Sequence, residues 1–225
     1  MFKNDYNQLS ENYPKFMYSG IIGFLMKKSH NLMEKNYRYF DNQNDIKVLE
    51  IGAGIKPHIE FLKHNFSSYN VLDLDFDDHL KKFYEKNFSN ISFQTYDGDT
   101  IPFDNESYDR IILSHCLEHI LDPEKILNEI IRIMKKTSIL SIAIPTDPGL
   151  MWRMGRNFVR KRAMKTYGIS KIDYEYIMAR EHVNSSFNLK SILEKKFHIY
   201  TKTFYPFNFN SLDLNLFYIV DLKKI

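Results

Sequence analysis

The stretch Val48–Gly54 constrains the fold of this chain more than any other. An apolar run ends in an acid, and two glycines one residue apart follow it. This pattern predicts a buried strand that ends at Ile51 and leads into a tight turn, because glycine tolerates a positive φ angle and lets a ligand approach the backbone closely. On its own, the turn is compatible with any nucleotide ligand.

Strands and helices are predicted to alternate between residues 46 and 145. Short apolar runs rich in β-branched residues alternate with segments of helical periodicity. Alternation at such short intervals predicts βαβ units and a parallel sheet that is covered by helices on both faces. After the first strand at 47–51, the predicted strands span residues 70–74, 91–96, 108–113 and 138–144.

Two helices of this region have start signals in the sequence. Pro57 suits the first turn of a helix, where no backbone donor is needed, and the apolar residues after it would form the buried face. Asp122 and Pro123 combine an N-cap with a proline at the first helical position. This second helix is expected to run to about Lys136, with Met134 on its core face.

The segments on either side of this core differ from it in pattern. Residues 1–45 are expected to form one or two helices that cover an edge of the sheet or act as a lid over the active site. Residues 146–190 interleave aromatic and basic residues and are expected to be a substrate-binding insertion. A final helix and an antiparallel strand pair, at 198–204 and 214–221, are expected within residues 191–225. The prediction is one α/β domain with seven strands, mostly parallel, the last one antiparallel.

Composition excludes several classes of protein. Cys116 is the only cysteine, so an intrachain disulfide framework is excluded and a reducing compartment fits. The net charge of +3 is too small to indicate bulk nucleic-acid binding. The sequence shows no signal-peptide pattern at residue 1 and no apolar run long enough to span a bilayer, so we expect a cytoplasmic protein. The oligomeric state is left open.

The acids near the strand ends indicate what the glycine turn binds. Asp75 follows Gly54 by 21 residues, which is the position of an acid that holds ribose hydroxyls. The third glycine of the dinucleotide pattern is missing, and a pyrophosphate would be repelled by the acids around the site. S-adenosylmethionine carries a sulfonium and no phosphate, so it suits this crevice better. The acids are Glu50, Asp73, Asp75, Asp97 and Asp99.

The order of these motifs resembles that of class I S-adenosylmethionine-dependent methyltransferases. The resemblance covers residues 46–145 and implies a Rossmann-like fold, this cofactor and a methyl-transfer reaction. No single motif is specific, but five in the expected order and spacing are. They are Val48–Gly54, Leu72–Asp75, Asp97–Phe103, Asp104–Asp109 and the segment from Leu117-Glu118-His119 to Lys136.

The resemblance also implies which residues hold the aminocarboxypropyl end of the cofactor. Glu50 and the backbone of Gly52, Ala53 and Gly54 match the family's positions for this part. Lys56 departs from the commonest pattern, in which a third glycine often stands, and leaves the shape of the loop open.

Residues at the ends of the next two strands match the family's positions for the nucleoside end of the cofactor. The resemblance implies that Asp75 binds the ribose hydroxyls, with Asp73 as the substitute if the strand ends earlier. It further implies that Asp97 and the backbone of Gly98 meet the adenine amino group.

Three histidines are candidates for the chemistry. The resemblance places Ser114 and His115 beside the methyl group, and His119 lies four residues after His115. A hydroxyl acceptor needs a base, and His115, His119 or His182 could accept its proton. A divalent metal bound by these three histidines is possible but not favoured. The third interpretation gives them a structural or substrate-shaping role.

The segment Met151–Lys165 carries six cations and no acid. One interpretation is a solvated helix face. The other is an anionic acceptor, bound by Arg153 and Arg156 with Trp152 and Glu181 beside it, since arginine makes bidentate phosphate contacts. A nucleotide-linked sugar would fit, and a membrane-surface or lipid-linked substrate would also fit.

These observations give one leading function and two alternatives. We expect O-methyl transfer from S-adenosylmethionine to a small polar acceptor, foremost a sugar hydroxyl of a nucleotide-linked or phosphorylated sugar. The insertion 146–190, with its interleaved aromatic and basic residues, is similar to that of methyltransferases of bacterial surface-polysaccharide pathways. The alternatives are a methyltransferase of a lipid-linked or other small anionic substrate, and a non-catalytic protein of this fold that binds a partner.

Overall fold

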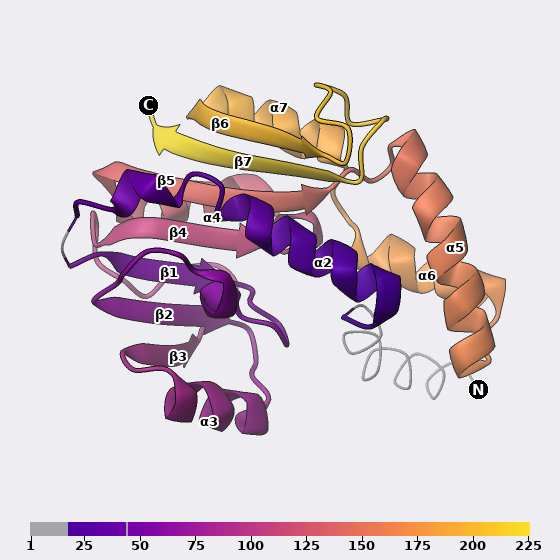
Figure 1. The fold of residues 1–225 in the computed structure, drawn as a ribbon, viewed down its shortest axis with the longest axis horizontal. Helices are drawn as coiled ribbons and strands as arrows, with labels where there is room; N and C mark the ends of the chain where they lie inside the picture. The colour runs from indigo at the N-terminus through magenta and orange to yellow at the C-terminus, as the bar shows by residue number, and fades with distance from the viewer. Residues whose placement is uncertain (1–17, 44) are drawn as a thin grey trace.

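A seven-stranded sheet with the order β3-β2-β1-β4-β5-β7-β6 forms the centre of the computed structural model, which describes residues 18–43 and 45–225 (Figure 1). β7 runs antiparallel to both of its neighbours, and all other pairs are parallel. The predicted mostly parallel sheet with an antiparallel last strand is therefore confirmed. The strands are β1 (Lys47–Ile51), β2 (Ser68–Asp73), β3 (Ile91–Thr95), β4 (Tyr108–Ser114), β5 (Met134–Pro145), β6 (Phe197–Tyr205) and β7 (Phe217–Lys224).

Helices cover both faces of this sheet. Figure 1 shows α2 crossing one face, while α4 and α7 lie on the other. Among the described residues, no helix has the length and apolar character needed to cross a membrane. The α-helices are α2 (Gly20–Met33), α3 (Asp78–Asn87), α4 (Pro123–Ile133), α5 (Leu150–Tyr167), α6 (Lys171–Glu181) and α7 (Ser186–Lys196), and the 3-10 turns are η1 (Tyr37–Phe40), η2 (His58–Phe61) and η3 (Leu117–His119).

The alternation of side chains along the strands builds two cores. Leu49 and Ile51 of β1 belong to the core under α4 and α7, whereas Val48 belongs to the core under α2. Successive residues of a strand point to opposite faces, so a strand that is buried on both faces reads as a continuous apolar run. Glu50 shares the α2 face with Val48, and its carboxylate is consequently buried.

The predicted helix after Pro57 is wrong. Only the short turn η2 forms, and Pro57 stands before it with an extended ψ angle of 140°. The space over this part of the sheet is taken by α2 instead, whose His30 reaches the His58 ring with an Nδ1–Nδ1 distance of 2.8 Å. Thus α2 packs across the face of the sheet, and the expected cover of a sheet edge is not what the described residues form.

The predicted boundary between α4 and β5 is also wrong. The helix ends at Ile133, and Met134 begins β5 opposite Tyr108 of β4. Met134 would be buried and Lys136 exposed whether this segment continued the helix or began the strand, so the apolar pattern does not distinguish the two conformations. Pairing with β4 decides the matter, and Lys135 reaches Asp109 at 2.7 Å. The predicted N-terminus is confirmed, because the Asp122 carboxylate accepts from the N–H of Lys125.

The insertion after β5 forms α5 and α6 at the carboxyl end of the sheet, on the right of Figure 1. α5 ends in Gly168, which has the left-handed φ angle of 69° typical of a helix C-terminus. Ser170 and Ser185 cap α6 and α7 through side-chain acceptors. The insertion thereby places two helices beside the strand ends at which ligands of such sheets bind.

Candidate active site

The glycine turn after β1 provides room for a ligand at the carboxyl end of the sheet. Gly52 and Gly54 have positive φ angles of 70° and 54°. A Cβ atom at Gly52 would lie 2.2 Å from the Sγ of Cys116, whereas one at Gly54 would meet nothing within 4 Å. Gly52 is therefore required by close packing, and Gly54 borders open space. The Asp73 carboxylate accepts from the N–H of Gly54 at 3.2 Å, which ties the turn to the end of β2.

The Glu50 carboxylate is held by protein donors. It accepts from the N–H of His58 at 2.9 Å and from the Tyr69 hydroxyl at 2.6 Å. Burial raises the pKa of Glu50 to about 7, although these two hydrogen bonds oppose the shift. Glu50 thus ties the far end of the glycine loop to the sheet, and a direct contact between its carboxylate and the cofactor stays a prediction.

The acids predicted for the nucleoside end lie on exposed loops. β2 ends at Asp73, so Asp75 stands two residues beyond the strand, and its carboxylate accepts from the N–H of Phe76. Asp97 is exposed as well; hydrogen bonds from the N–H groups of Thr100 and Asp99 lower its pKa. Both carboxylates are accessible to a ligand, and their roles in binding ribose and adenine stay predictions, as does that of Gly98.

His115 follows β4 directly and contacts α2. Its φ angle is 53°, and its Nε2 lies 2.8 Å from the Ser29 hydroxyl. The hydroxyl proton of Ser29 goes to the carbonyl of Met26 at 2.7 Å, so Ser29 can only accept from His115. Nε2 therefore carries the ring proton and Nδ1 is the free acceptor. Burial lowers the pKa of His115 to about 3, which keeps the ring neutral at physiological pH but makes it a weak base.

A chain of buried polar groups connects this edge to the interior. Ser114 Oγ lies 3.5 Å from His30 Nδ1, His30 reaches His58, and His58 Nε2 lies 2.9 Å from Glu34. Glu34 then pairs with Arg110 at 2.6 Å, and both side chains are almost completely buried. The sequence analysis did not identify this chain. Its one local signal was the presence of two polar residues four positions apart in an apolar segment, His30 within α2 and Glu34 directly after it.

Asp147 and His182 form a hydrogen-bonded pair of a carboxylate and an imidazole. The Asp147 carboxylate lies 3.0 Å from His182 Nδ1, and both side chains are largely buried. Burial alone would lower the pKa of His182, but the hydrogen bond to Asp147 and the charge of Glu118 raise it. Asp147 takes Nδ1 and leaves Nε2 for an acceptor. Sequence analysis missed Asp147, although its place two residues after β5 follows the same rule as the other strand-end acids.

The other candidates surround this pair. The rings of His119 and His182 meet edge to face at 5.1 Å, and Trp152 stacks on His182 at 5.9 Å. His119 Nδ1 donates to the backbone carbonyl of Glu181 at 2.7 Å, and substrate binding by Glu181 and Trp152 stays a prediction. Glu118 is 2% exposed and its Oε2 has no hydrogen-bond partner; burial raises its pKa.

The metal interpretation of the three histidines stays a prediction. One ring nitrogen of each has a protein partner, which is Ser29 for His115 Nε2, a carbonyl for His119 Nδ1 and Asp147 for His182 Nδ1. Such partners are compatible with metal binding by the other nitrogen. Within residues 18–43 and 45–225, no three His, Cys, Asp or Glu side chains form a group that could hold a metal ion.

The predicted arginines have different surroundings. Arg156 pairs with Glu175 of α6 at 3.1 Å, and Arg160 pairs with the same carboxylate. Arg153 is exposed. The charge that these residues could offer to a phosphate is therefore partly neutralised within the protein, and substrate binding by Arg153 and Arg156 stays a prediction.

Comparison with known proteins agrees with this geometry. A family model described as "Methyltransferase domain" matches residues 25–195. The demethylmenaquinone methyltransferase of Staphylococcus carnosus is 27% identical over 184 residues, which cover 76% of this chain and 73% of the relative. The ubiquinone/menaquinone biosynthesis C-methyltransferase UbiE of Campylobacter jejuni is 23% identical over 146 residues; the match covers 60% of this chain and 62% of the length of that relative.

Solved structures show the same fold. A SAM-dependent methyltransferase from Aquifex aeolicus superposes with a TM-score of 0.56 at 15% identity, covering 86% of this chain and 89% of the other. A SAM-dependent methyltransferase from Thermotoga maritima, described as a possible histamine N-methyltransferase, has a TM-score of 0.56 at 16% identity and covers 99% of each chain. The chain belongs to the methyltransferase-domain family and has the fold of class I S-adenosylmethionine-dependent methyltransferases.

Proposed function

We propose that this protein transfers a methyl group from S-adenosylmethionine to a hydroxyl-bearing acceptor, and that His182 accepts the hydroxyl proton. The observation that carries the proposal is the contact of 3.0 Å between Asp147 and His182 Nδ1 beside the carboxyl end of β5. A carboxylate on one ring nitrogen fixes the tautomer and raises the basicity of the other nitrogen. Of the three histidines expected from the sequence, His182 alone has a carboxylate within hydrogen-bond distance among the described residues; the Glu118 carboxylate lies farther away, 3.9 Å from His115 Nδ1 and 3.7 Å from His119 Nε2.

The cofactor's sulfonium supplies an activated methyl group, so the protein has to position the acceptor and remove its proton. The open side of the Gly52–Gly54 turn fits the aminocarboxypropyl end, and the exposed carboxylates of Asp75 and Asp97 fit the nucleoside end. As the acceptor oxygen bonds to the methyl carbon, its proton passes to Nε2 of His182. Asp147 stabilises the imidazolium that forms. His115, neutral and with its free Nδ1, can accept a hydrogen bond from the acceptor.

The first candidate acceptor is a sugar hydroxyl on a phosphorylated carrier, such as a nucleotide-linked sugar of a surface-polysaccharide pathway. Arg153 and Arg156 lie on α5 with Trp152, whose ring stacks on His182, so a phosphate bound there would lie near the base. The pairing of Arg156 with Glu175 weakens the case for a soluble pyrophosphate. A carrier that makes further contacts with the protein would compensate for the weaker binding of the pyrophosphate.

A second candidate is a quinol that is methylated on a ring carbon. After the hydroxyl has lost its proton, the ring carbon bonds to the methyl group, and the C–H bond at that carbon then breaks to release a proton and restore the aromatic ring. This candidate is favoured by the names of the relatives from Staphylococcus carnosus and Campylobacter jejuni, which are a demethylmenaquinone methyltransferase and a C-methyltransferase of quinone biosynthesis. The same base, His182, would serve this reaction.

The test combines cofactor binding with a panel of acceptors. Calorimetry with S-adenosylmethionine comes first, and an absence of binding would remove both the cofactor and the enzyme from the proposal, leaving the non-catalytic alternative. Nucleotide sugars, lipid-linked sugars and quinols are then incubated with a labelled methyl donor, with and without chelator. The position of the label in the product separates O- from C-methylation.

The assignment of the base is tested by a matched pair of variants. His182→Gln is expected to lower kcat by roughly 10²-fold or more, with cofactor affinity unchanged. His79→Gln serves as the control, because His79 is an exposed histidine on α3, near the opposite edge of the sheet. Equal kcat values for His182→Gln and the unaltered chain would refute the assignment.

A further inference from the structure

Apolar side chains gather on the outer side of the molecule where α5 meets the connection between β6 and β7. Met154 is 61% exposed, Phe158 58% and Phe209 60%. Side chains of this size are normally buried, and a contiguous exposed group of them marks an interaction site. We call this group the outer apolar patch; its members are Leu150, Met154, Phe158, Phe207, Phe209 and Leu214.

The two elements that carry the patch are bonded to each other. The N–H of Met151 donates to the carbonyl of Asp213 at 2.9 Å, and the N–H of Leu150 donates to the Asp213 carboxylate at 3.4 Å. Phe207 and Phe209 stack at 6.2 Å within the connection. The first turn of α5 and the β6–β7 connection therefore form one surface.

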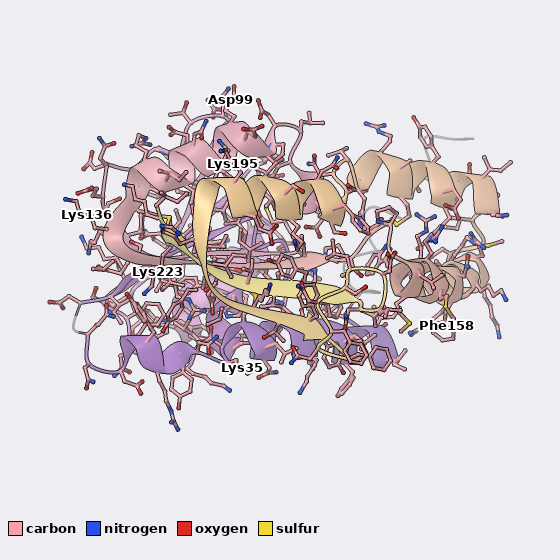
Figure 2. All side chains as sticks on the ribbon, turned by 90° about the horizontal axis from the view of Figure 1, so that it is seen from above. Lys35, Asp99, Lys136, Phe158, Lys195 and Lys223 are labelled. Atoms are coloured by element: carbon pink, nitrogen blue, oxygen red, sulfur yellow. The ribbon has the colours of Figure 1, made fainter. Side chains whose placement is uncertain are left out.

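Helical spacing separates this surface from the active site. Leu150, Met154 and Phe158 recur every four residues and thus lie on one side of α5. Trp152 belongs to another side and stacks on His182. In Figure 2, Phe158 lies on α5 at the end of the molecule opposite to Lys136. The helix consequently faces the site with one side and the surroundings with the other.

Positive charge accompanies the apolar residues on the outer side. Arg153, Lys161 and Lys165 are exposed, and helical spacing places them on the side of Leu150 and Met154. α5 contains no acid in its eighteen residues. The Asp213 carboxylate lies at the start of the helix, where it accepts from a backbone N–H.

The neighbouring helix α6 carries an acid, Glu175, that pairs with two other cations of α5. Its partners are Arg156 and Arg160, whereas none of the ion pairs among the described residues involves Arg153, Lys161 or Lys165. The outer apolar patch is thus bordered by cations whose charge the neighbouring helix does not cancel.

We propose that the outer apolar patch docks on the surface of an anionic lipid bilayer. A helix with apolar side chains beside lysine and arginine lies in the membrane interface, where burial of apolar surface and attraction to anionic headgroups act together. No helix of the described residues could span the bilayer, so the contact would be peripheral. Charge complementarity favours a bilayer over a second copy of this chain, whose identical cations would face those of the first.

Docking would bring the bilayer close to the reacting groups. Leu150 is three residues from Asp147, and Trp152 between Leu150 and Met154 already touches His182. Resting on the proposed function, this placement names the acceptor class: a hydroxyl-bearing molecule carried by a lipid. The lipid would supply the binding energy that the paired arginines do not.

Vesicle sedimentation with the full-length protein tests the docking. The probes are phosphatidylcholine vesicles with and without phosphatidylglycerol, at low and high salt. We expect binding to the anionic vesicles, little binding to the neutral ones and release at high salt. Arg153→Gln combined with Lys161→Gln should weaken binding about fivefold for each cation removed. Met154→Ser combined with Phe158→Ser should weaken it more than tenfold.

Phe83→Ser is the matched control. Phe83 is 55% exposed, close to the value of Phe158, but lies on α3 at the other edge of the sheet. The proposal is overturned if the unaltered protein does not bind anionic vesicles, or if Phe83→Ser weakens binding as much as the combination of Met154→Ser and Phe158→Ser does. A dimer that the Met154→Ser, Phe158→Ser variant dissociates, without any vesicle binding, would assign the patch to a second copy and overturn it as well.

The vesicle assay needs neither cofactor nor acceptor, so its failure is distinct from failure of the proposed function. Binding to vesicles without methyl transfer to lipid-carried hydroxyls would uphold the docking and refute the acceptor class. Methyl transfer to a water-soluble acceptor without vesicle binding would refute both the docking and the acceptor class, and would leave the proposed methyl transfer standing.

Discussion

Replacing Glu34 with Gln tests the buried ion pair under α2. The Glu34 carboxylate lies 2.6 Å from Arg110, and the two side chains are 0% and 2% exposed. It also accepts from the N–H of Lys63 at 3.0 Å and contacts His58 Nε2 at 2.9 Å. The amide introduced by Glu34→Gln keeps the shape and one oxygen acceptor. It leaves the guanidinium buried without a compensating charge and turns one acceptor oxygen into a donor nitrogen.

The expected cost follows from these contacts. Removing one partner of a buried ion pair costs about 3–5 kcal/mol, because the remaining charge is desolvated without compensation. With a urea m-value of about 2–3 kcal/mol per molar, the midpoint of unfolding should fall by roughly 1–2 M. Replacing Arg110 by Met in the same chain removes the orphaned charge, so Glu34→Gln with Arg110→Met should recover much of the loss.

The assay is urea unfolding at 25 °C, followed by circular dichroism at several pH values. Burial alone would raise the pKa of Glu34, but Arg110 and the hydrogen bond from His58 outweigh it and lower the pKa well below the ordinary value. A depressed carboxyl pKa contributes stability above the unfolded pKa, and this is lost as the pH falls through the folded pKa. The difference between the unaltered chain and Glu34→Gln should therefore be full near neutral pH and shrink below roughly pH 4. A loss below about 1 kcal/mol at neutral pH, or no recovery in the double variant, would refute the reasoning.

Three further predictions concern the site. Gly52→Ala, with a φ angle of 70° and a methyl group 2.2 Å from a sulfur atom, should weaken cofactor binding about tenfold or more in calorimetry, and wild-type affinity would contradict the close packing. Asp147→Asn removes a group that raises the pKa of His182. The activity of the unaltered chain should rise with pH through a His182 pKa above the ordinary value of histidine; in the variant the activity should fall and this acidic limb should move to lower pH, and an unmoved limb would count against the pair. Ser29→Ala should allow both tautomers of His115 in ¹⁵N NMR spectra, whereas the unaltered chain and Ser29→Thr should show only the Nε2–H form, and a Nδ1–H form in the unaltered chain would contradict the hydrogen-bond assignment.

The elements that sequence analysis predicted correctly are those specified by local residues. Asp122 with Pro123 starts α4, because an N-cap needs only the residues beside it. The mostly parallel sheet followed from the alternation of strands and helices along the chain. Local residues could not end α4, since Met134 is buried equally well by either conformation.

Some candidate residues of the site were also named from the sequence. His182 was expected from the sequence, and so were the strand-end acids, since the carboxyl ends of parallel strands meet at one edge. The contacts of α2 were not, because Ser29 lies 86 residues before His115 and Glu34 lies 76 residues before Arg110. No periodicity links such distant residues. Only the folded sheet brings them together.

The polar face that α2 covers has a consequence for where this domain begins. A chain that started at residue 46 would contain every strand and all of the glycine turn. It would still lack the carboxylate that neutralises the Arg110 guanidinium, and the three buried groups Glu50, His58 and Ser141 on the same face would be open to water. The family match likewise begins at residue 25, inside α2. The smallest unit that can fold therefore includes α2, and truncation or fusion at the first strand should yield an unstable protein.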